Sequence, residues 1–253
     1  MVICAIVVFL ILQRGIEALR QHEHRLHLYR RASGVPPDWK GSDDEVQAVH
    51  ELGDDPSAEA SRMLIDLATH PRGLLVFSQE AAISELGKRK NPDIPPILAA
   101  LIQTGTPSDS RRAAAQALQT LPCNAQCSRS LLDYLSRIDS GELNAEDQVP
   151  EDVNSEAYKD VEAEIIEDQQ EIYGLVYSVL MHAPDTTNMV LTQDYGLGTA
   201  TPKKFALTFV TREHNQSFCP ALIQAQRRSQ SGLDASVRTS VAEAAKTLQC
   251  GTD

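Results

Sequence analysis

One helical pattern recurs along the chain, and this repetition limits the possible folds more than any other feature. Residues 46–68 align without a gap with residues 80–102 at an offset of 34 positions. Further overlays, at offsets of 32 and 124 positions, place Ala114 and Ala206 at the position of Ala82. A period in this range is typical of helical hairpins that stack into an array.

Each copy predicts a first helix with small residues on its inner face, a short polar turn, and a second helix with a stripe of Leu and Ile. Small residues let neighbouring helices approach closely, and the stripe fills the space between them. Residues 108–109, Pro202 and Asp234 suit the caps or first turns of three expected helices. Gly53 and Gly87 stand where a helix C-terminal cap needs a positive φ. One hairpin cannot bury its apolar face alone, whereas stacked copies can.

The composition favours the same fold class. Aromatic residues make up 5% of the chain and hydrophobic residues 42%. Ala and Leu recur at helical spacing, which favours helices packed through small residues over strands. We therefore predict an all-α fold, a short α-solenoid of helical hairpins with an N-terminal hydrophobic helix and a mostly helical insertion.

The sequence DSRRAAAQALQTL at residues 109–121, together with the repeat period, resembles HEAT-like repeats of the short kind grouped with phycobilisome lyases. The resemblance covers residues 43–140 and 202–250, a little over half of the chain. Tetratricopeptide repeats have a similar length, but they place a Trp in the first helix, and the only tryptophan here, Trp39, lies outside the array. The resemblance implies a divergent α-solenoid, and its relatives include bilin lyases.

The repeats and their interruptions predict a division of the chain into five segments. In chain order these are an N-terminal membrane and juxtamembrane helix (1–31), a linker (32–42), HEAT-like repeats 1–3 (43–140), an acidic insertion with a long helix (141–201), and repeat 4 with a terminal half-repeat (202–253).

The first twelve residues are uninterrupted apolar sequence. Twelve helical residues rise about 18 Å, which is short of the roughly 30 Å hydrocarbon core of a bilayer. Three interpretations stay open: a membrane helix whose upstream residues are missing, a signal peptide without its basic region, and a buried helix. No A-x-A-like cleavage site follows the apolar run. We favour a membrane anchor through residues 1–14.

The position of the body relative to the membrane depends on two opposing signals. Arginines follow the apolar run, and the positive-inside rule would keep that flank cytoplasmic. Apart from Cys4 there are four cysteines, an even number that suits two disulfides in an oxidising compartment. Their repeat positions predict the bridges Cys123–Cys127 and Cys219–Cys250. The balance favours an extracytoplasmic body, with the cytoplasmic alternative open.

The formal net charge of −12 comes from one segment. Residues 142–171 contain twelve carboxylates and one lysine, so the rest of the chain is close to neutral. A nucleic-acid-binding protein needs a basic stripe that neutralises phosphates, and the body of the chain has none. We therefore expect no nucleic-acid partner.

The acidic segment belongs to the insertion, which is the predicted binding region. Apolar residues at helical spacing follow the acidic loop and predict a long helix whose outer face carries the carboxylates. Residues 189–192 are the best strand candidate. Insertions into helical arrays protrude from one face, and such faces often bind partners. The candidate binding residues are Tyr158, Glu162, Tyr173, Tyr177, His182 and Asp194.

No sequence motif predicts a metal site or a cofactor. On a helix His24 and His27 share a face but His22 points elsewhere, whereas zinc needs three or four convergent ligands. The acidic segment has no loop with the ligand spacing of a calcium site. Residues 196–204 lack the spacing of a phosphate-binding loop, and no hydrolase or protease motif is present. We nominate no catalytic residue.

Together these features predict a non-enzymatic, membrane-tethered scaffold or adaptor that binds a protein partner through its repeat surface and acidic insertion. The alternative is a chromophore-lyase-like or other small-molecule-handling enzyme on the same fold, with Tyr173, Tyr177, His182 and Asp194 as its candidate residues. A purely structural envelope protein is a third possibility.

Overall fold

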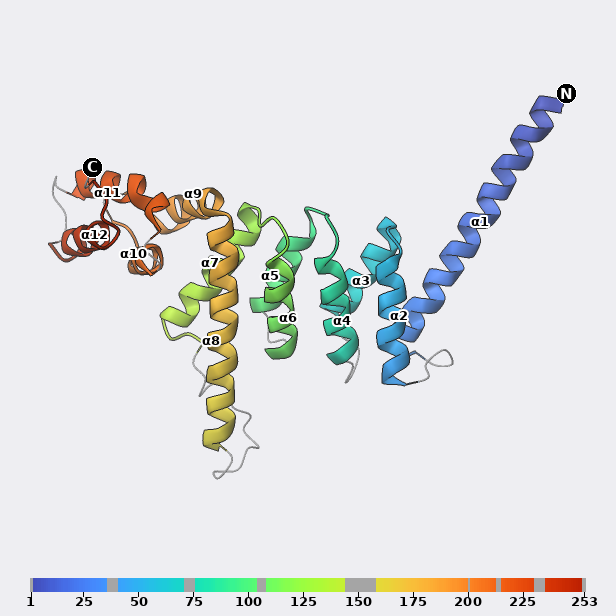
Figure 1. Ribbon diagram of the computed structural model, residues 1–253, viewed down its shortest axis with the longest axis horizontal. Coiled ribbons are helices and arrows are strands. Elements are labelled where there is room, and N and C mark those ends of the chain that lie inside the picture. The colour runs from blue at the N-terminus through green and yellow to red at the C-terminus, as the bar shows by residue number, and fades with distance from the viewer. Residues whose placement is uncertain are drawn as a thin grey trace. The chain divides into compact units, whose positions relative to one another are not determined.

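The computed structural model is helical in every part that it describes (Figure 1). Two compact units make up the chain, Met1–Ile94 and Pro95–Asp253, and each is described by itself. The described residues are 2–35, 41–70, 76–103, 108–143, 158–199, 201–212, 215–229 and 235–251. Within these ranges no strand occurs, so the predicted all-α fold class is confirmed.

The first unit contains four helices: α1 (Val2–Ala32), α2 (Ser42–Asp54), α3 (Ala58–Thr69) and α4 (Val76–Gly87). α2 packs against α1, α3 and α4, and α3 also packs against α4. Leu52, Leu64 and Leu86 are fully buried between these helices. The Ser57 side chain caps α3 by accepting a hydrogen bond from the Ala60 amide, as serine does at a helix N-cap.

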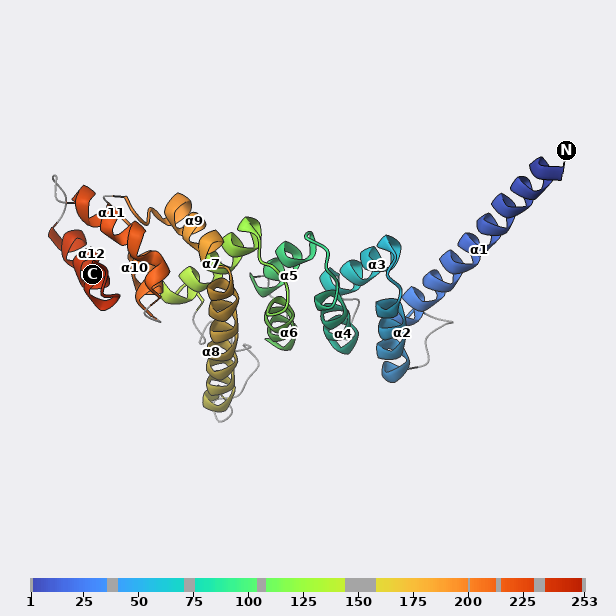
Figure 2. The ribbon, with the colours of Figure 1, turned by 45° about the horizontal axis from the view of Figure 1, so that its top comes forward.

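The second unit contains the remaining helices, among which α6 packs against α8 and α7 packs against α9 (Figures 1 and 2). At the C-terminal end, α12 packs against both α10 and α11. The bounds are α5 (Ile94–Gln103), α6 (Ser108–Leu118), α7 (Ala125–Asp139), α8 (Tyr158–His182), α9 (Pro184–Tyr195), α10 (Lys204–Thr211), a 3-10 turn (Gln216–Phe218), α11 (Cys219–Ser229) and α12 (Ala235–Thr247).

Helices α8 and α9, which the sequence marks as an interruption, form a further pair in this packing. α8 lies against α6 and α9 lies against α7, so the pair packs on the pair before it. The strand prediction for residues 189–192 is wrong, because these residues lie inside α9. Thr187, Val190 and Leu191 are buried on one face at helical spacing, and this packing decides the structure over local strand preference.

Small residues occupy matching places in the first helices of three of the pairs. Ala82 in α4, Ala114 in α6 and Ala206 in α10 are all fully buried. Because an alanine side chain is a single methyl group, it lets the next helix approach closely. The architecture is therefore all-α with consecutive helices packed in pairs, as a helical repeat requires.

Two of the predicted helix ends differ from expectation. Neither Gly53 nor Gly87 has a positive φ. Gly53 is required for another reason, because a Cβ atom there would lie 2.7 Å from Cγ of the buried Glu85 side chain. The left-handed cap is instead found at Gly196, which ends α9 with a φ of 68°. The expected cap Asp234 lies outside the described residues.

The apolar start of the chain belongs to α1, which extends past α2 in Figure 1. Leu10, Leu12, Ile16 and Leu19 are all more than half exposed. The C-terminal half of α1 packs on the first unit, where Leu28 and Ala32 are buried. Over the described ranges, no helix has both the length and the apolar character needed to traverse a bilayer.

Candidate functional site

The outer face of α7 carries a row of polar side chains. Arg129, Asp133, Ser136 and Ser140 follow one another at i, i+4, i+7 and i+11, which places them on one line along the helix. The opposite face is apolar and buried, and it holds α7 against the core of the second unit. Asn124 fixes the start of the helix, because its side chain accepts a hydrogen bond from the Cys127 amide at 3.0 Å.

Two cavities lie along this row, and we call them together the α7 groove. The first, of about 610 Å³, lies between α5, α7, the end of α9 and the start of α10. The second, of about 440 Å³, lies between the end of α7 and the start of α10. The first is lined by Ala100, Gln103, Arg129, Ser130, Asp133, Asp194, Tyr195 and Lys203. The second is lined by Ser136, Asp139, Ser140, Lys204, Phe205 and Thr208.

The first cavity contains one ion pair and one lysine over an aromatic ring. Arg129 Nε donates to Asp194 Oδ2 at 2.6 Å. Lys203 Nζ lies 4.8 Å from the centre of the Tyr195 ring, within the range of a cation–π contact. Burial, with the nearby carboxylates of Asp133 and Asp194, raises the pKa of Tyr195 to about 12. The phenol therefore stays protonated at neutral pH and serves as a hydrogen-bonding and stacking group.

In the second cavity Asp139 is positioned by a hydrogen bond from α8. The Tyr173 hydroxyl donates to Asp139 Oδ1 at 3.3 Å, and the Arg212 guanidinium lies 4.2 Å from the centre of the Tyr173 ring. Partial burial raises the pKa of Asp139, while the Tyr173 hydrogen bond and the charge of Arg212 act in the opposite direction. The Asp139 carboxylate lines the second cavity, where a ligand can contact it.

The two cavities are joined by aromatic packing at the start of α10. The rings of Tyr195 and Phe205 lie 5.3 Å apart, and Phe205 lies 6.0 Å from Phe209 in the core. Because Phe209 is buried, this chain of contacts ties the groove floor to the interior. The hydroxyl groups, single charges and aromatic rings along the groove can donate and accept hydrogen bonds and form ion pairs with a ligand.

The structure divides the six predicted binding residues among several places. Asp194 lines the first cavity, and Tyr173 supports Asp139 beside the second. Tyr177 is a core residue whose hydroxyl donates to the Phe209 carbonyl at 3.0 Å. His182 is exposed at the end of α8, and Glu162 lies on the first half of that helix. The side chain of Tyr158 lies outside the described residues.

The groove residues of α7 and α10 were not predicted from the sequence. Asp133, Asp139, Lys203 and Lys204 lie in segments that the repeat pattern explains as structural. The row of polar residues at helical spacing from Arg129 to Ser140 is visible in the sequence, and it could have indicated Asp133. The facing lysines could not be found in this way, since their position depends on the packing of α10 near α7.

The four cysteines outside residue 4 form two disulfides, Cys123–Cys127 and Cys219–Cys250. Their Cα atoms lie 5.4 Å and 5.2 Å apart, distances typical of unforced bridges. The first is buried and joins the residue before the α7 N-cap to the first turn of α7, and the second joins the start of α11 to the residues after α12. In the described part of the chain, no group of three or more His, Cys, Asp or Glu side chains is arranged to hold a metal ion.

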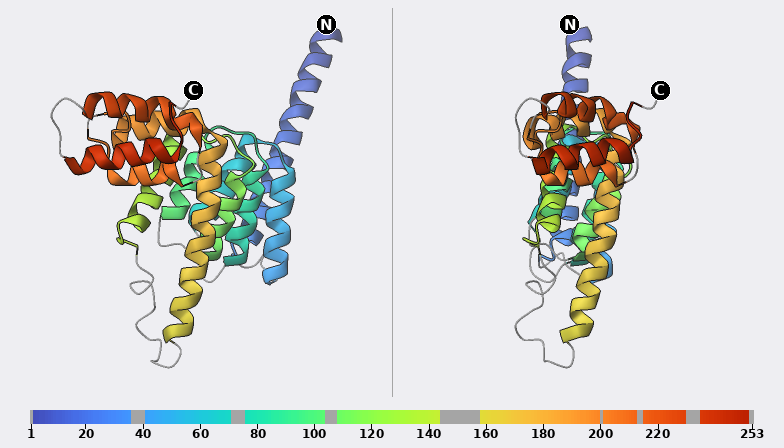
Figure 3. Two further views of the ribbon diagram at one scale, coloured as in Figure 1. Left: turned by 60° about the vertical axis from the view of Figure 1, so that its left-hand side comes forward. Right: turned by 90° about the vertical axis from the view of Figure 1, so that its left-hand side faces the viewer.

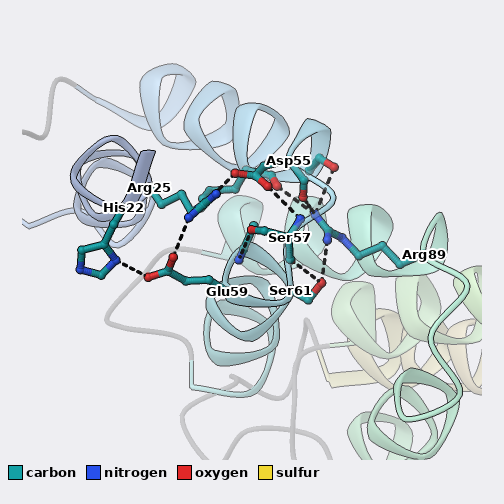
Figure 4. A network of polar contacts seen from close by, with 10 residues as sticks. His22, Arg25, Asp55, Ser57, Glu59, Ser61 and Arg89 are labelled. Carbon is teal, nitrogen blue, oxygen red and sulfur yellow. Dashed lines mark hydrogen bonds and ion pairs between the residues drawn. The ribbon is translucent and has the colours of Figure 1, made fainter. Parts of the chain in front are cut away.

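A separate polar network, which we call the α1 clamp, holds α1 to the first unit (Figure 4). Arg25 donates from Nε to Asp55 at 2.6 Å and from Nη1 to Glu59 at 2.7 Å. His22 Nδ1 lies 2.5 Å from the same Glu59 carboxylate. Hydrogen bonds from Arg25 and His22 hold the pKa of Glu59 below its usual range. Burial alone would raise the pKa of Asp55, but bonds from Arg25 and Ser57 outweigh it and lower the pKa.

Arg89 ties the next helix pair to the same region. Its guanidinium donates to the carbonyl oxygens of Leu52, Gly53 and Asp55 at 2.7 to 3.1 Å, and to Ser61 Oγ at 2.6 Å. Partial burial lowers the pKa of this guanidinium. The carbonyl groups belong to the C-terminal end of α2, where helix carbonyls lack helical partners. Arg89 therefore caps α2 and connects it to α3.

Comparison of the chain with protein-family models, with curated proteins and with solved structures gives no match. The assignment of function therefore depends on the chemistry of the α7 groove.

Proposed function

We propose that the protein is a non-enzymatic scaffold that binds a protein partner through the α7 groove, on HEAT-like helix pairs, and that its N-terminus attaches it to a membrane. The observation that carries the proposal is the groove itself. Two preformed cavities follow one polar row along α7, and the walls carry hydroxyl groups, isolated charges and aromatic rings. Such a surface offers directional contacts along an extended ligand.

The first half of α8 supports the proposal as a second contact surface. Figure 3 shows this part of α8 extending past the end of α6. Arg112 pairs with Asp168 at 2.8 Å and with Glu171 at 3.5 Å, and so holds α8 against α6. Four carboxylates nearer the start of α8 have no ion-pair partner among the described residues, namely Asp160, Glu162, Glu164 and Glu167. They are available to a partner with basic groups beside the groove-bound segment.

The proposed attachment to a membrane rests on the exposed apolar start of α1. Leu10, Leu12, Ile16 and Leu19 together expose apolar surface that no other part of the described chain covers. Burying such surface in lipid is favourable by roughly 25 cal/mol per Å². Two disulfides favour an oxidising compartment for the body. Vesicle flotation of the full chain and of a variant with Leu10, Leu12 and Ile16 changed to Gln tests the attachment.

Binding through the groove is tested with a pair of matched substitutions. Ser136→Trp fills the second cavity, and Ser240→Trp places the same side chain on an exposed turn of α12. Each variant is crosslinked in native membranes beside the wild-type chain, and captured proteins are quantified. We expect a protein that the wild type and Ser240→Trp capture equally and that Ser136→Trp loses. Equal capture by all three chains would contradict the role of the groove.

The alternative of a chromophore-handling enzyme has no specific support. It would need Tyr173, Tyr177, His182 and Asp194 to line one cavity. Among the described residues, these side chains are divided between the core, the end of α8 and the first cavity. We therefore do not propose it.

A further inference from the structure

The α7 groove has a regular charge arrangement that indicates what kind of segment it binds. The first cavity is lined by one α7 carboxylate, Asp133, and by Lys203. The second is lined by another α7 carboxylate, Asp139, and by Lys204. Apart from Arg129 and Asp194, which pair with each other in the first cavity, each cavity has an anion on its α7 wall and a cation on the opposite wall.

These opposite charges do not neutralise one another. Within the described residues, Asp133 and Asp139 form no ion pair with either lysine, although Arg129 and Asp194 in the same groove pair at 2.6 Å. Asp139 accepts only hydrogen bonds from Tyr173, and the ammonium group of Lys203 lies over the Tyr195 ring. The carboxylates and ammonium groups are therefore not paired with one another across the groove, and all four side chains are exposed.

We propose that the α7 groove binds an extended peptide segment of alternating charge, with basic side chains at Asp133 and Asp139 and acidic side chains at Lys203 and Lys204. This inference rests on the proposed function and specifies its partner segment. A ligand of a single charge would satisfy one wall of each cavity and place like charges against the other.

The spacing along α7 fixes the register of such a segment. Asp133 and Asp139 are six residues apart, which corresponds to about 9 Å along a helix. An extended chain advances about 3.3 Å per residue and points successive side chains to opposite sides, so basic side chains two residues apart face the same wall about 7 Å from each other. Long lysine side chains can extend from there to both carboxylates. Lys203 and Lys204 line the two cavities on the other side, where the acidic side chains between the basic ones face them. The matching pattern is K-E-K-E.

The ring pair between the cavities fits the same occupant. Tyr195 and Phe205 lie 5.3 Å apart at the boundary between the two cavities. Since neither ring carries a charge at neutral pH, the aliphatic stems of the lysine and glutamate side chains can pack on them. The hydroxyl groups of Ser130, Ser136 and Thr208 line the cavities and can bond to peptide main-chain groups.

The test uses labelled four-residue peptides and the full chain, with binding measured by fluorescence anisotropy. The probe is K-E-K-E with blocked ends, and the comparison peptides are K-K-K-K, E-E-E-E and Q-Q-Q-Q. We expect the alternating peptide to bind most tightly and to weaken as salt rises, because exposed charges are screened. Asp133→Asn and Lys203→Met should each weaken binding about three- to fivefold, as loss of one exposed ion pair does.

Control variants and a charge reversal make the test decisive. Asp54→Asn and Lys246→Met change exposed residues outside the groove and should bind the probe as the wild type does. The double variant Asp133→Lys with Asp139→Lys should instead prefer the all-acidic peptide. Circular dichroism confirms that each variant is folded.

Three outcomes would overturn the inference: equal or tighter binding of a single-charge peptide by the wild type, binding unchanged by Asp133→Asn and Lys203→Met, or no binding of the alternating peptide. If the peptide fails while capture of a protein still depends on Ser136, only the charge pattern is wrong. If the peptide binds as expected but Ser136→Trp leaves protein capture unchanged, the groove is a peptide site and the scaffold proposal fails.

Discussion

Replacing Arg89 by methionine should destabilise the first unit by a measurable amount. The guanidinium donates four hydrogen bonds, three to carbonyl oxygens at the end of α2 and one to Ser61. Hydrogen bonds from a charged donor contribute about 1.5–3 kcal/mol each when considered singly. The four share one donor group and the freed carbonyls regain water, so we expect a total loss of about 2–3 kcal/mol rather than the sum.

Two assays locate the effect. Urea unfolding followed by circular dichroism gives the change in the free energy of unfolding. Hydrogen exchange measured by mass spectrometry on peptides from residues 42–70 shows whether the end of α2 and the start of α3 lose protection. Arg89→Lys should retain only part of the stability, because its ammonium group keeps the charge but cannot reach all four acceptors.

The matched control is Arg62→Met, which changes an exposed arginine on α3. Surface substitutions of this kind usually stay within about 0.5 kcal/mol. If Arg89→Met destabilises the protein no more than Arg62→Met does, Arg89 is not the cap that its contacts indicate. A loss of exchange protection confined to residues outside 42–70 would contradict the argument equally.

Three further predictions concern stability. Gly53→Ala should destabilise the protein by more than about 1 kcal/mol, because the new Cβ meets the Glu85 side chain. In the same urea assay Gly174→Ala should stabilise the protein by about 0.5–1 kcal/mol, because a Cβ at this position of α8 meets no other atom. Removing the Cys219–Cys250 bridge, which spans 31 positions, should cost about 3–4 kcal/mol against about 2 kcal/mol for Cys123–Cys127, which spans 4; equal losses would exclude a loop-entropy origin. The pKa values of Asp55, Glu59 and Glu85 are lowered in the folded state, so their stabilisation is present above the unfolded pKa near about 4 and is lost as pH falls through the folded values. Thermal unfolding should therefore shift down below about pH 4, less so in Arg25→Met, and an unchanged acid shift in that variant would contradict the role of the α1 clamp.

The helical architecture could be predicted from the sequence because it depends on a local pattern that repeats. Ala82, Ala114 and Ala206 mark the close-packed positions of three first helices, and each is buried as such a position must be. The helix ends were harder to predict from the sequence. Gly53 looks like a cap in the sequence, but its role comes from Glu85, which is 32 residues away.

The strand prediction failed because it used only four residues. Residues 189–192 prefer extended structure by themselves, but Pro184 suits the first turn of a helix and Gly196 suits its end. Packing of Val190 and Leu191 against the core then decides the outcome. A local sequence pattern could not predict the α7 groove either. Lys203 and Lys204 line its cavities only because the fold brings the start of α10 close to α7.

Site-specific photocrosslinking from the α7 groove tests directly whether the groove binds a protein. A photoreactive side chain is placed at residue 136 in the second cavity and, as the control, at the exposed residue 243 on α12. Both chains are irradiated in native membranes and the adducts are identified by mass spectrometry. We expect an adduct with one protein from position 136 that is absent from position 243. Adducts of equal yield from both positions, or from position 243 alone, would contradict this expectation.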